Sequence, residues 1–113
     1  MLDGSGLSAR LRLEKLPVLD GTMACLRAGI FSSLHPQNRK FESSVLNIHE
    51  YDNETITEVL FDPQTAGGLL AAVSAEQAEQ AEQVVKDLQA AGYSQACIIG
   101  SIRQEAIDQV ILA

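Results

Sequence analysis

Apolar and polar side chains alternate near the start of the chain. From residue 7 to residue 13, leucines and an alanine form one face, and Ser8, Arg10 and Arg12 form the other. This period of two predicts a half-buried β-strand with a basic outer face. The preceding residues 1–6 resemble the end of a helix, so we expect an upstream segment before them.

A short helix is predicted after the break at Leu16-Pro17, from Gly21 to Ala28. Asp20 can cap its start by accepting hydrogen bonds from first-turn N–H groups. Gly29 suits the left-handed position past the helix end, and Ile30 can fold back onto the last turn. Both ends of this helix are therefore defined by local residues.

The middle of the chain is less regular. Residues 31–40 are polar and are predicted to form an exposed loop, in which His35-Pro36 favours an extended backbone. Apolar residues interspersed with polar ones over residues 44–51 predict a second strand. A short turn of helix is expected to start at Asn53 and to end near Leu60.

The second half contains the clearest helix. Leu69 to Val73 is an uninterrupted apolar run after a turn-forming segment, which is typical of a strand covered on both faces. A helix is predicted from Ala75 to Ala91, started by a capping box of Ser74 and Gln77 and ended by Gly92. Its alanine, valine and leucine positions form one apolar stripe.

Two closing strands are predicted, over residues 95–102 and 106–112, with a polar turn between them. Together these elements predict an α+β fold with one mixed β-sheet of about five strands, covered by helices on at least one face. The 113 residues fit a single domain, residues 1–113, with one core.

Charge and hydropathy narrow the range of partners. The formal net charge is −7, which opposes the counterion release that drives binding to nucleic acids and acidic membranes. No apolar run approaches the roughly 20 residues that span a bilayer, and the amino terminus lacks a basic segment followed by an apolar one. We therefore expect a cytoplasmic protein for which neither nucleic acid nor membrane is a partner.

The two cysteines, Cys25 and Cys97, are far apart in sequence and lie inside apolar segments. Buried free thiols are favoured over a disulfide or a reactive site. The histidines His35 and His49 are isolated from the cysteines and from each other, so the spacing predicts no metal cluster.

One segment concentrates chemical groups before the apolar run: Asp62-Pro63-Gln64-Thr65-Ala66-Gly67-Gly68. The paired glycines would let a phosphate approach the backbone N–H groups, with the Thr65 hydroxyl assisting. Alternatively, the segment is a tight turn in which Asp62 bonds its own downstream backbone. It is not a P-loop, because Leu69 stands where that motif has lysine. Spacing alone leaves both alternatives open.

The longer stretch Leu60-Phe61-Asp62-Pro63-Gln64-Thr65-Ala66-Gly67-Gly68-Leu69-Leu70 resembles the signature of the carboxy-terminal domain of selenophosphate synthetases (selenide, water dikinases). Leu16-Pro17-Val18-Leu19-Asp20-Gly21 resembles the upstream segment of that domain. Ala91-Gly92-Tyr93 and Ile98-Ile99-Gly100 resemble its ending. The resemblance covers nearly the whole chain, from about Ser5 onward.

The resemblance implies a fold similar to the carboxy-terminal domain of aminoimidazole ribonucleotide synthetase, in whose superfamily ATP lies between two domains. The complete enzyme would convert selenide, ATP and water to selenophosphate, AMP and phosphate, with Mg²⁺ neutralising phosphoryl charge. The amino-terminal domain of the same polypeptide would be the partner, and the complete protein could be a homodimer. The family's catalytic cysteine or selenocysteine, lysine and metal-binding aspartates would lie upstream. The resemblance therefore assigns this chain no catalytic or metal-binding residue, and we expect the fragment alone to be inactive and to require no cofactor.

The resemblance places several residues of this chain near the nucleotide or its phosphates: Asp62, Gln64, Thr65, Gly67, Gly68 and, as a second candidate, Asn38. Ala66 departs from the family, which usually has serine there, and the change removes a hydroxyl from the turn. The loop from Ser32 to Asn38 also departs. It resembles the variant in members that are fused behind a flavin-dependent dehydrogenase-like domain.

Two other functions compete with a domain of a dikinase. A free-standing module that binds a ligand or a protein could keep the fold without the chemistry, which the acidic composition and Ala66 would suit. A branch of the superfamily that acts on purine intermediates fits less well, because the Asp62-Pro63-Gln64-Thr65 run resembles the selenium branch.

Overall fold

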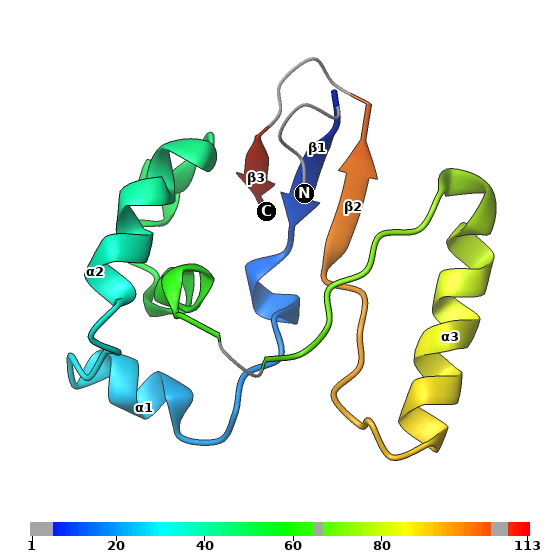
Figure 1. Ribbon diagram of the computed structural model, residues 1–113, viewed down its shortest axis with the longest axis horizontal. Coiled ribbons are helices and arrows are strands. Elements are labelled where there is room, and N and C mark those ends of the chain that lie inside the picture. The colour runs from blue at the N-terminus through cyan, green and yellow to red at the C-terminus, as the bar shows by residue number, and fades with distance from the viewer. Residues whose placement is uncertain (1–5, 65–66, 105–108) are drawn as a thin grey trace.

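The computed structural model describes residues 6–64, 67–104 and 109–113, and the fold is α+β (Figure 1). Among these residues, one sheet contains three strands: β1 (Ser8–Leu11), β2 (Gly100–Arg103) and β3 (Val110–Leu112). The α-helices are α1 (Thr22–Arg27), α2 (His35–Asn38) and α3 (Ala78–Ala90). Shorter 3₁₀ helices connect them: η1 (Leu13–Lys15), η2 (Arg39–Ser44), η3 (Ile48–Tyr51), η4 (Thr55–Phe61) and η5 (Ala75–Gln77).

The sheet is mixed and has β1 at its centre, in the order β2-β1-β3. Ala9 of β1 lies opposite Ile102 in the antiparallel pair with β2 and opposite Val110 in the parallel pair with β3. Gly100 fits β2 because a Cβ at that position would overlap the Arg10 carbonyl of β1. The predicted first strand and the described part of the last one are confirmed with shorter bounds. β2 keeps only residues 100–102 of the strand predicted over 95–102, and it extends to Arg103, which the sequence assigns to the turn. The described residues contain three strands and not about five, and residues 106–108 of the last predicted strand lie outside them.

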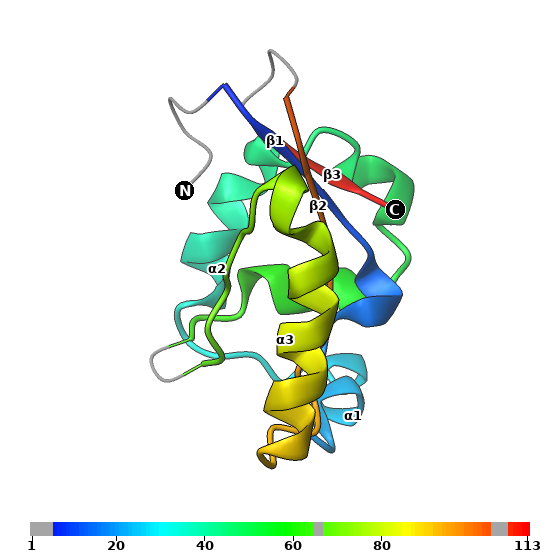
Figure 2. The same ribbon diagram turned by 90° about the vertical axis from the view of Figure 1, so that its right-hand side faces the viewer.

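The core lies against one face of this sheet. Its buried cluster contains Leu13, Val45, Ile48, Phe61 and Leu112. Leu11 packs against the same cluster, and Arg10 and Arg12 are exposed, as the alternation predicts, but Ser8 of the predicted outer face is buried. Figures 1 and 2 show α1 and α2 grouped on one side of the molecule and α3 standing apart on the β2 side.

The end of α1 follows the prediction and its start does not. Gly29 has a φ of 70°, its N–H donates to the Leu26 carbonyl at 3.0 Å, and the Ile30 N–H donates to the Cys25 carbonyl at 2.9 Å. These two bonds complete a Schellman stop. No side chain caps the first turn of α1, so the predicted capping role of Asp20 is wrong.

The exposed loop predicted for residues 31–40 is wrong, because α2 and the start of η2 occupy much of this segment. Pro36 lies in the first turn of α2, where its missing N–H costs no helical hydrogen bond. His35 is buried against Glu58, which lies 23 residues further along the chain. This long-range contact gives the segment a fixed conformation that its local composition does not indicate.

The strand predicted for residues 44–51 is reduced to a single bridge. Val45 pairs in parallel with Val110, and the Leu46 N–H donates to the Val110 carbonyl at 2.8 Å. The side chain of Asn47 then contacts the edge of β3, and the backbone turns into η3. A side-chain amide therefore replaces the backbone ladder that a strand would have continued.

The apolar run 69–73 belongs to no helix or strand in the described structure, and its residues are exposed. The prediction of a strand covered on both faces is therefore wrong. Both edges of the central strand β1 are already occupied by β2 and β3, so the run has no place beside β1.

The long helix is confirmed with a shifted start. Residues 75–77 form η5, and the Ser74 hydroxyl lies 3.5 Å from the Gln77 side-chain oxygen instead of capping the backbone. Gly92 has a φ of 102°, and the Tyr93 N–H donates to the Leu88 carbonyl at 3.0 Å, as predicted for the helix end. No residue of α3 is fully buried, so its apolar stripe remains largely uncovered in the described structure.

Candidate functional site

The candidate turn begins at Asp62, directly after η4 ends at Phe61, and side chains within it contact one another. The Gln64 side-chain amide donates to the Asp62 carboxylate. Gln64 also lies against Gly67, because a Cβ on Gly67 would be only 2.8 Å from the Gln64 side-chain oxygen and 3.0 Å from its Cβ. Gly68 has open space at the same position, with no atom within 4 Å. Asp62, Gln64 and Gly67 therefore form one small unit, and Gly68 is exposed beside it.

Asn38 of α2 contacts the entrance to this turn. Its side-chain amide donates to the Phe61 carbonyl at 3.1 Å. Phe61 is the last residue of η4, and a carbonyl at a helix end has no partner within the helix. Asn38 thus satisfies the backbone group that immediately precedes Asp62.

A polar network joins the same two elements behind Asn38. His35 Nε2 lies 3.1 Å from a Glu58 carboxylate oxygen and 3.3 Å from the Glu58 backbone carbonyl. Because both neighbours are acceptors, this nitrogen carries the proton in the contact. Arg39 Nη1 donates to the second Glu58 oxygen at 2.8 Å, and Arg39 Nε donates to Glu42 at 3.0 Å. Glu58 is therefore held from two positions one helical turn apart.

Aromatic rings pack around this network. The His35 ring lies 4.6 Å from that of Phe31 and 6.4 Å from that of Phe61, measured between centroids. The Arg39 guanidinium lies 4.7 Å from the centroid of the Phe61 ring, which places a cation over its face. The ion pair between Arg39 and Glu58 is partly shielded from water, so it holds the segment more firmly than a surface pair would.

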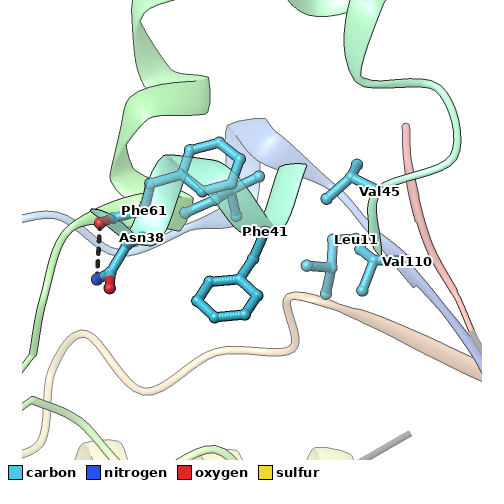
Figure 3. Close-up of a pocket in the computed structure, with 7 residues that line it drawn as sticks. Leu11, Asn38, Phe41, Val45, Phe61 and Val110 are labelled. Carbon is cyan, nitrogen blue, oxygen red and sulfur yellow. Dashed lines mark hydrogen bonds between the residues drawn. The ribbon is translucent and has the colours of Figure 1, made fainter. Parts of the chain in front are cut away.

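A hollow of about 300 Å³ lies next to Asn38 and Phe61 (Figure 3). Its lining residues are Leu11, Asn38, Phe41, Val45, Leu60, Phe61 and Val110. Figure 3 shows the bonded pair of Asn38 and Phe61 at one end, Phe41 in the middle, and Val45, Leu11 and Val110 at the other end. The walls are apolar apart from Asn38, so the hollow itself offers little to a charged ligand.

The structure brings together several of the residues singled out in the sequence. Asn38 bonds Phe61, the residue that precedes the turn. Within the turn, Gln64 donates to Asp62, and Gly67 packs on Gln64. Thr65 and Ala66 lie outside the described residues. The bond between Asp62 and Gln64 supports the tight-turn alternative in part, although Asp62 uses a side chain as its partner and not the backbone.

Sequence reasoning missed His35, Arg39 and Glu58. The spacing of His35 and Arg39 places both on one face of a helix, but this signal was hidden by the assignment of the segment to a loop. Glu58 carries no local signal, since its partners lie about twenty residues earlier in the chain.

The described residues do not fit a site for Mg²⁺. Within residues 6–64, 67–104 and 109–113, no three His, Cys, Asp or Glu side chains lie close enough to hold a metal ion. The Asp62 carboxylate accepts a hydrogen bond from Gln64. A magnesium ion prefers several oxygen ligands in octahedral geometry, which this turn alone does not provide.

Both cysteines are free and exposed, so their predicted burial is wrong. Cys25 lies on α1, a helix without buried residues, and the Cys97 thiol donates to the Lys15 carbonyl at 3.3 Å.

None of the helices in the described part of the chain combines the length and the apolar character that crossing a bilayer requires.

Three known proteins to which the chain is similar share one name. The chain is 30% identical over 102 residues to the selenide, water dikinase of Clostridioides difficile, an alignment that covers 90% of this chain and 28% of the relative. It is 34% identical over 103 residues to the enzyme of the same name from Pseudomonas straminea, covering 91% of this chain and 28% of the relative. With the Aeromonas hydrophila protein of that name, 41% identity extends over 76 residues, covering 67% of this chain and 21% of the relative.

The chain thus spans less than a third of the length of the curated relatives it matches. No protein-family model matches the chain, and no solved structure does either. The matches nevertheless extend through the candidate turn and its flanks, since they cover up to 99% of the chain. The chain therefore belongs to the family of selenide, water dikinases, the selenophosphate synthetases.

Proposed function

We propose that this chain is the carboxy-terminal domain of an ATP-dependent selenide, water dikinase and forms one wall of its nucleotide site. The observation that carries the proposal is the coverage: the alignments include 90% and 91% of this chain but only 28% of each relative. A match of this kind is expected when one domain of a larger enzyme is compared with the whole.

The complete polypeptide would transfer phosphoryl groups from ATP, with selenide and water as acceptors. In this reaction the chain would contribute shape and backbone N–H donors, with Gly68 open to an approaching ligand. The reactive groups and the ligands for Mg²⁺ would come from an amino-terminal domain of the same polypeptide.

An amino-terminal domain of the same polypeptide would also cover apolar surface. Leu69, Leu70 and Val73 are exposed, and so are Val84 and Leu88 of α3. Exposed apolar side chains are typical of surfaces that contact another domain or subunit when they form a continuous patch. Homodimerisation, a fusion to a flavin-dependent dehydrogenase-like domain and a cytoplasmic location are further proposals for the complete protein.

The proposal is tested by comparing the 113-residue chain with the complete polypeptide that contains it. We expect selenide-dependent AMP formation from ATP by the complete polypeptide and none by the chain alone. AMP formation by the isolated chain would contradict the assignment of the reactive groups to another domain. A complete polypeptide that is inactive with selenide and active with a purine intermediate would overturn the selenium assignment.

A second candidate is a ligand- or protein-binding module without catalysis. The bond between Gln64 and Asp62 favours it, because the Asp62 carboxylate has a partner within the chain and needs no substrate to supply one. A reading frame that begins at Met1 and encodes no further domain would support this alternative.

A further inference from the structure

We propose that Asn38 is a positioning residue, held by His35 and Arg39, that sets the direction in which the chain leaves η4 toward Asp62 and Gln64. All three residues belong to the short segment formed by α2 and the first residue of η2. Each of the three contacts η4: Glu58 accepts from His35 and Arg39, and Phe61 accepts from Asn38.

The contact at Phe61 determines the exit of the chain. The backbone N–H of Asp62 donates to the Val59 carbonyl at 3.2 Å, and the Phe61 carbonyl accepts from Asn38 at 3.1 Å. Asp62 itself has an extended conformation, with φ −68° and ψ 126°. The peptide between Phe61 and Asp62 is therefore held on both sides, and the planar peptide bond transmits that orientation to Asp62.

The surroundings of Asn38 make this hold firm. The His35 side chain is only 8% exposed, and those of Arg39 and Glu58 are 28% and 27% exposed. Two side chains, His35 and Arg39, contact the one Glu58 carboxylate and leave η4 little freedom to slide along α2. A functional group is held accurately when the residues behind it are themselves packed and hydrogen-bonded, and Asn38 is in that situation.

The positioning role of Asn38 does not depend on the proposed function. Only the identity of the affected ligand, ATP, rests on it. Because the turn would offer donors to the phosphates of ATP, a changed exit from η4 would weaken nucleotide binding although Asn38 touches no nucleotide. The effect would appear mainly in KM for ATP, since the reacting groups would lie in another domain.

The decisive variant is Asn38→Asp, which keeps the size of the side chain, removes its N–H donor and places a carboxylate opposite the Phe61 carbonyl. The matched control is Gln37→Leu, since Gln37 is the exposed neighbour on α2 and has no side-chain hydrogen bond among the described residues. In the 113-residue chain, we expect Asn38→Asp to shift the amide resonances of Asp62, Gln64 and Gly67, while the methyl resonances of Leu112 stay in place. Gln37→Leu should leave all of them unchanged.

A measurement on the unaltered chain covers the case in which Asn38→Asp does not fold. The side-chain amide of Asn38 should exchange its hydrogens more slowly than that of Gln37, because only the former is bonded to a partly buried carbonyl. Equal exchange rates would overturn the inference. Unchanged resonances of Asp62 and Gln64 in a folded Asn38→Asp variant would do the same.

The complete polypeptide supplies the functional test. Asn38→Asp should raise KM for ATP by about two- to tenfold, the range for one hydrogen bond, with kcat changed by less than about twofold. Gln37→Leu should change neither constant. A complete polypeptide without selenide-dependent activity would overturn the proposed function and leave the resonance test of Asn38 intact. Shifted resonances with an unchanged KM would overturn the role in nucleotide binding alone.

Discussion

The side-chain amide of Asn47 pairs with both backbone polar groups of Leu112. Asn47 Nδ2 donates to the Leu112 carbonyl at 3.0 Å, and Asn47 Oδ1 accepts from the Leu112 N–H at 2.8 Å. An amide side chain has the same donor and acceptor groups as a peptide unit, so Asn47 serves as one rung of a ladder at the β3 edge. It follows the backbone bridge between Val45 and Val110 and attaches a segment 65 residues distant to the end of the sheet.

Removal of this side chain should therefore destabilise the fold. Asn47→Ala leaves the two polar groups of Leu112 without their partner, and we expect a loss of about 1–3 kcal/mol in the free energy of unfolding. Asn53→Ala is the control, since Asn53 is exposed and its side chain makes no hydrogen bond in the described structure. Urea denaturation measures both; similar midpoints for the two variants would refute the role of Asn47.

The core and the uncovered apolar run should respond differently to the same substitution. Leu112 is 2% exposed in the buried cluster, so Leu112→Ala should cost about 2–5 kcal/mol in unfolding free energy. Leu69 is fully exposed, and Leu69→Ala should change the stability by no more than about 0.5 kcal/mol. Thermal unfolding of the 113-residue chain distinguishes them. A large loss with Leu69→Ala would mean that the run 69–73 is buried in solution.

Alanine substitutions at the two glycines of the turn are predicted to affect Gln64 differently. Gly67→Ala brings a Cβ against Gln64 and should displace that side chain from Asp62, whereas Gly68→Ala meets open space. The side-chain amide resonances of Gln64 should therefore move in Gly67→Ala and stay in place in Gly68→Ala. Because neither glycine has a positive φ, backbone strain does not separate the two variants. Equal shifts would show that Gln64 does not pack on Gly67.

Both thiols should react without denaturant. Cys25 and Cys97 are the two cysteines of the sequence, and both are free and exposed. Titration of the native chain with a chromogenic disulfide reagent should modify two thiols per chain, and Cys25→Ser should reduce this number to one. Modification that requires urea would restore the burial predicted from the sequence.

Local signals predicted the carboxy-terminal ends of α1 and α3 well, but they predicted the helix starts and the segments between helices poorly. The stops at Gly29 and Gly92 follow from a left-handed glycine and the residues beside it, so a few neighbouring positions contain the whole signal. The start of α2 depends on a contact between His35 and Glu58 that no local pattern reports. In the candidate site, the sequence identified Asn38 as well as the turn, but it did not indicate that Asn38 bonds the Phe61 carbonyl.

The sequence by itself determined the alternation of β1, the helix α3 and the acidic charge, because each is a property of neighbouring residues or of composition. It also determined the family, through its similarity to selenide, water dikinases along most of the chain. Only the tertiary structure decided that the edge of β3 is paired by the Asn47 side chain and that the run 69–73 stands outside the sheet. Strand pairing and burial depend on which distant segment gains the most free energy by pairing with a given sheet edge. The hydrophobic pattern of one segment does not encode that competition.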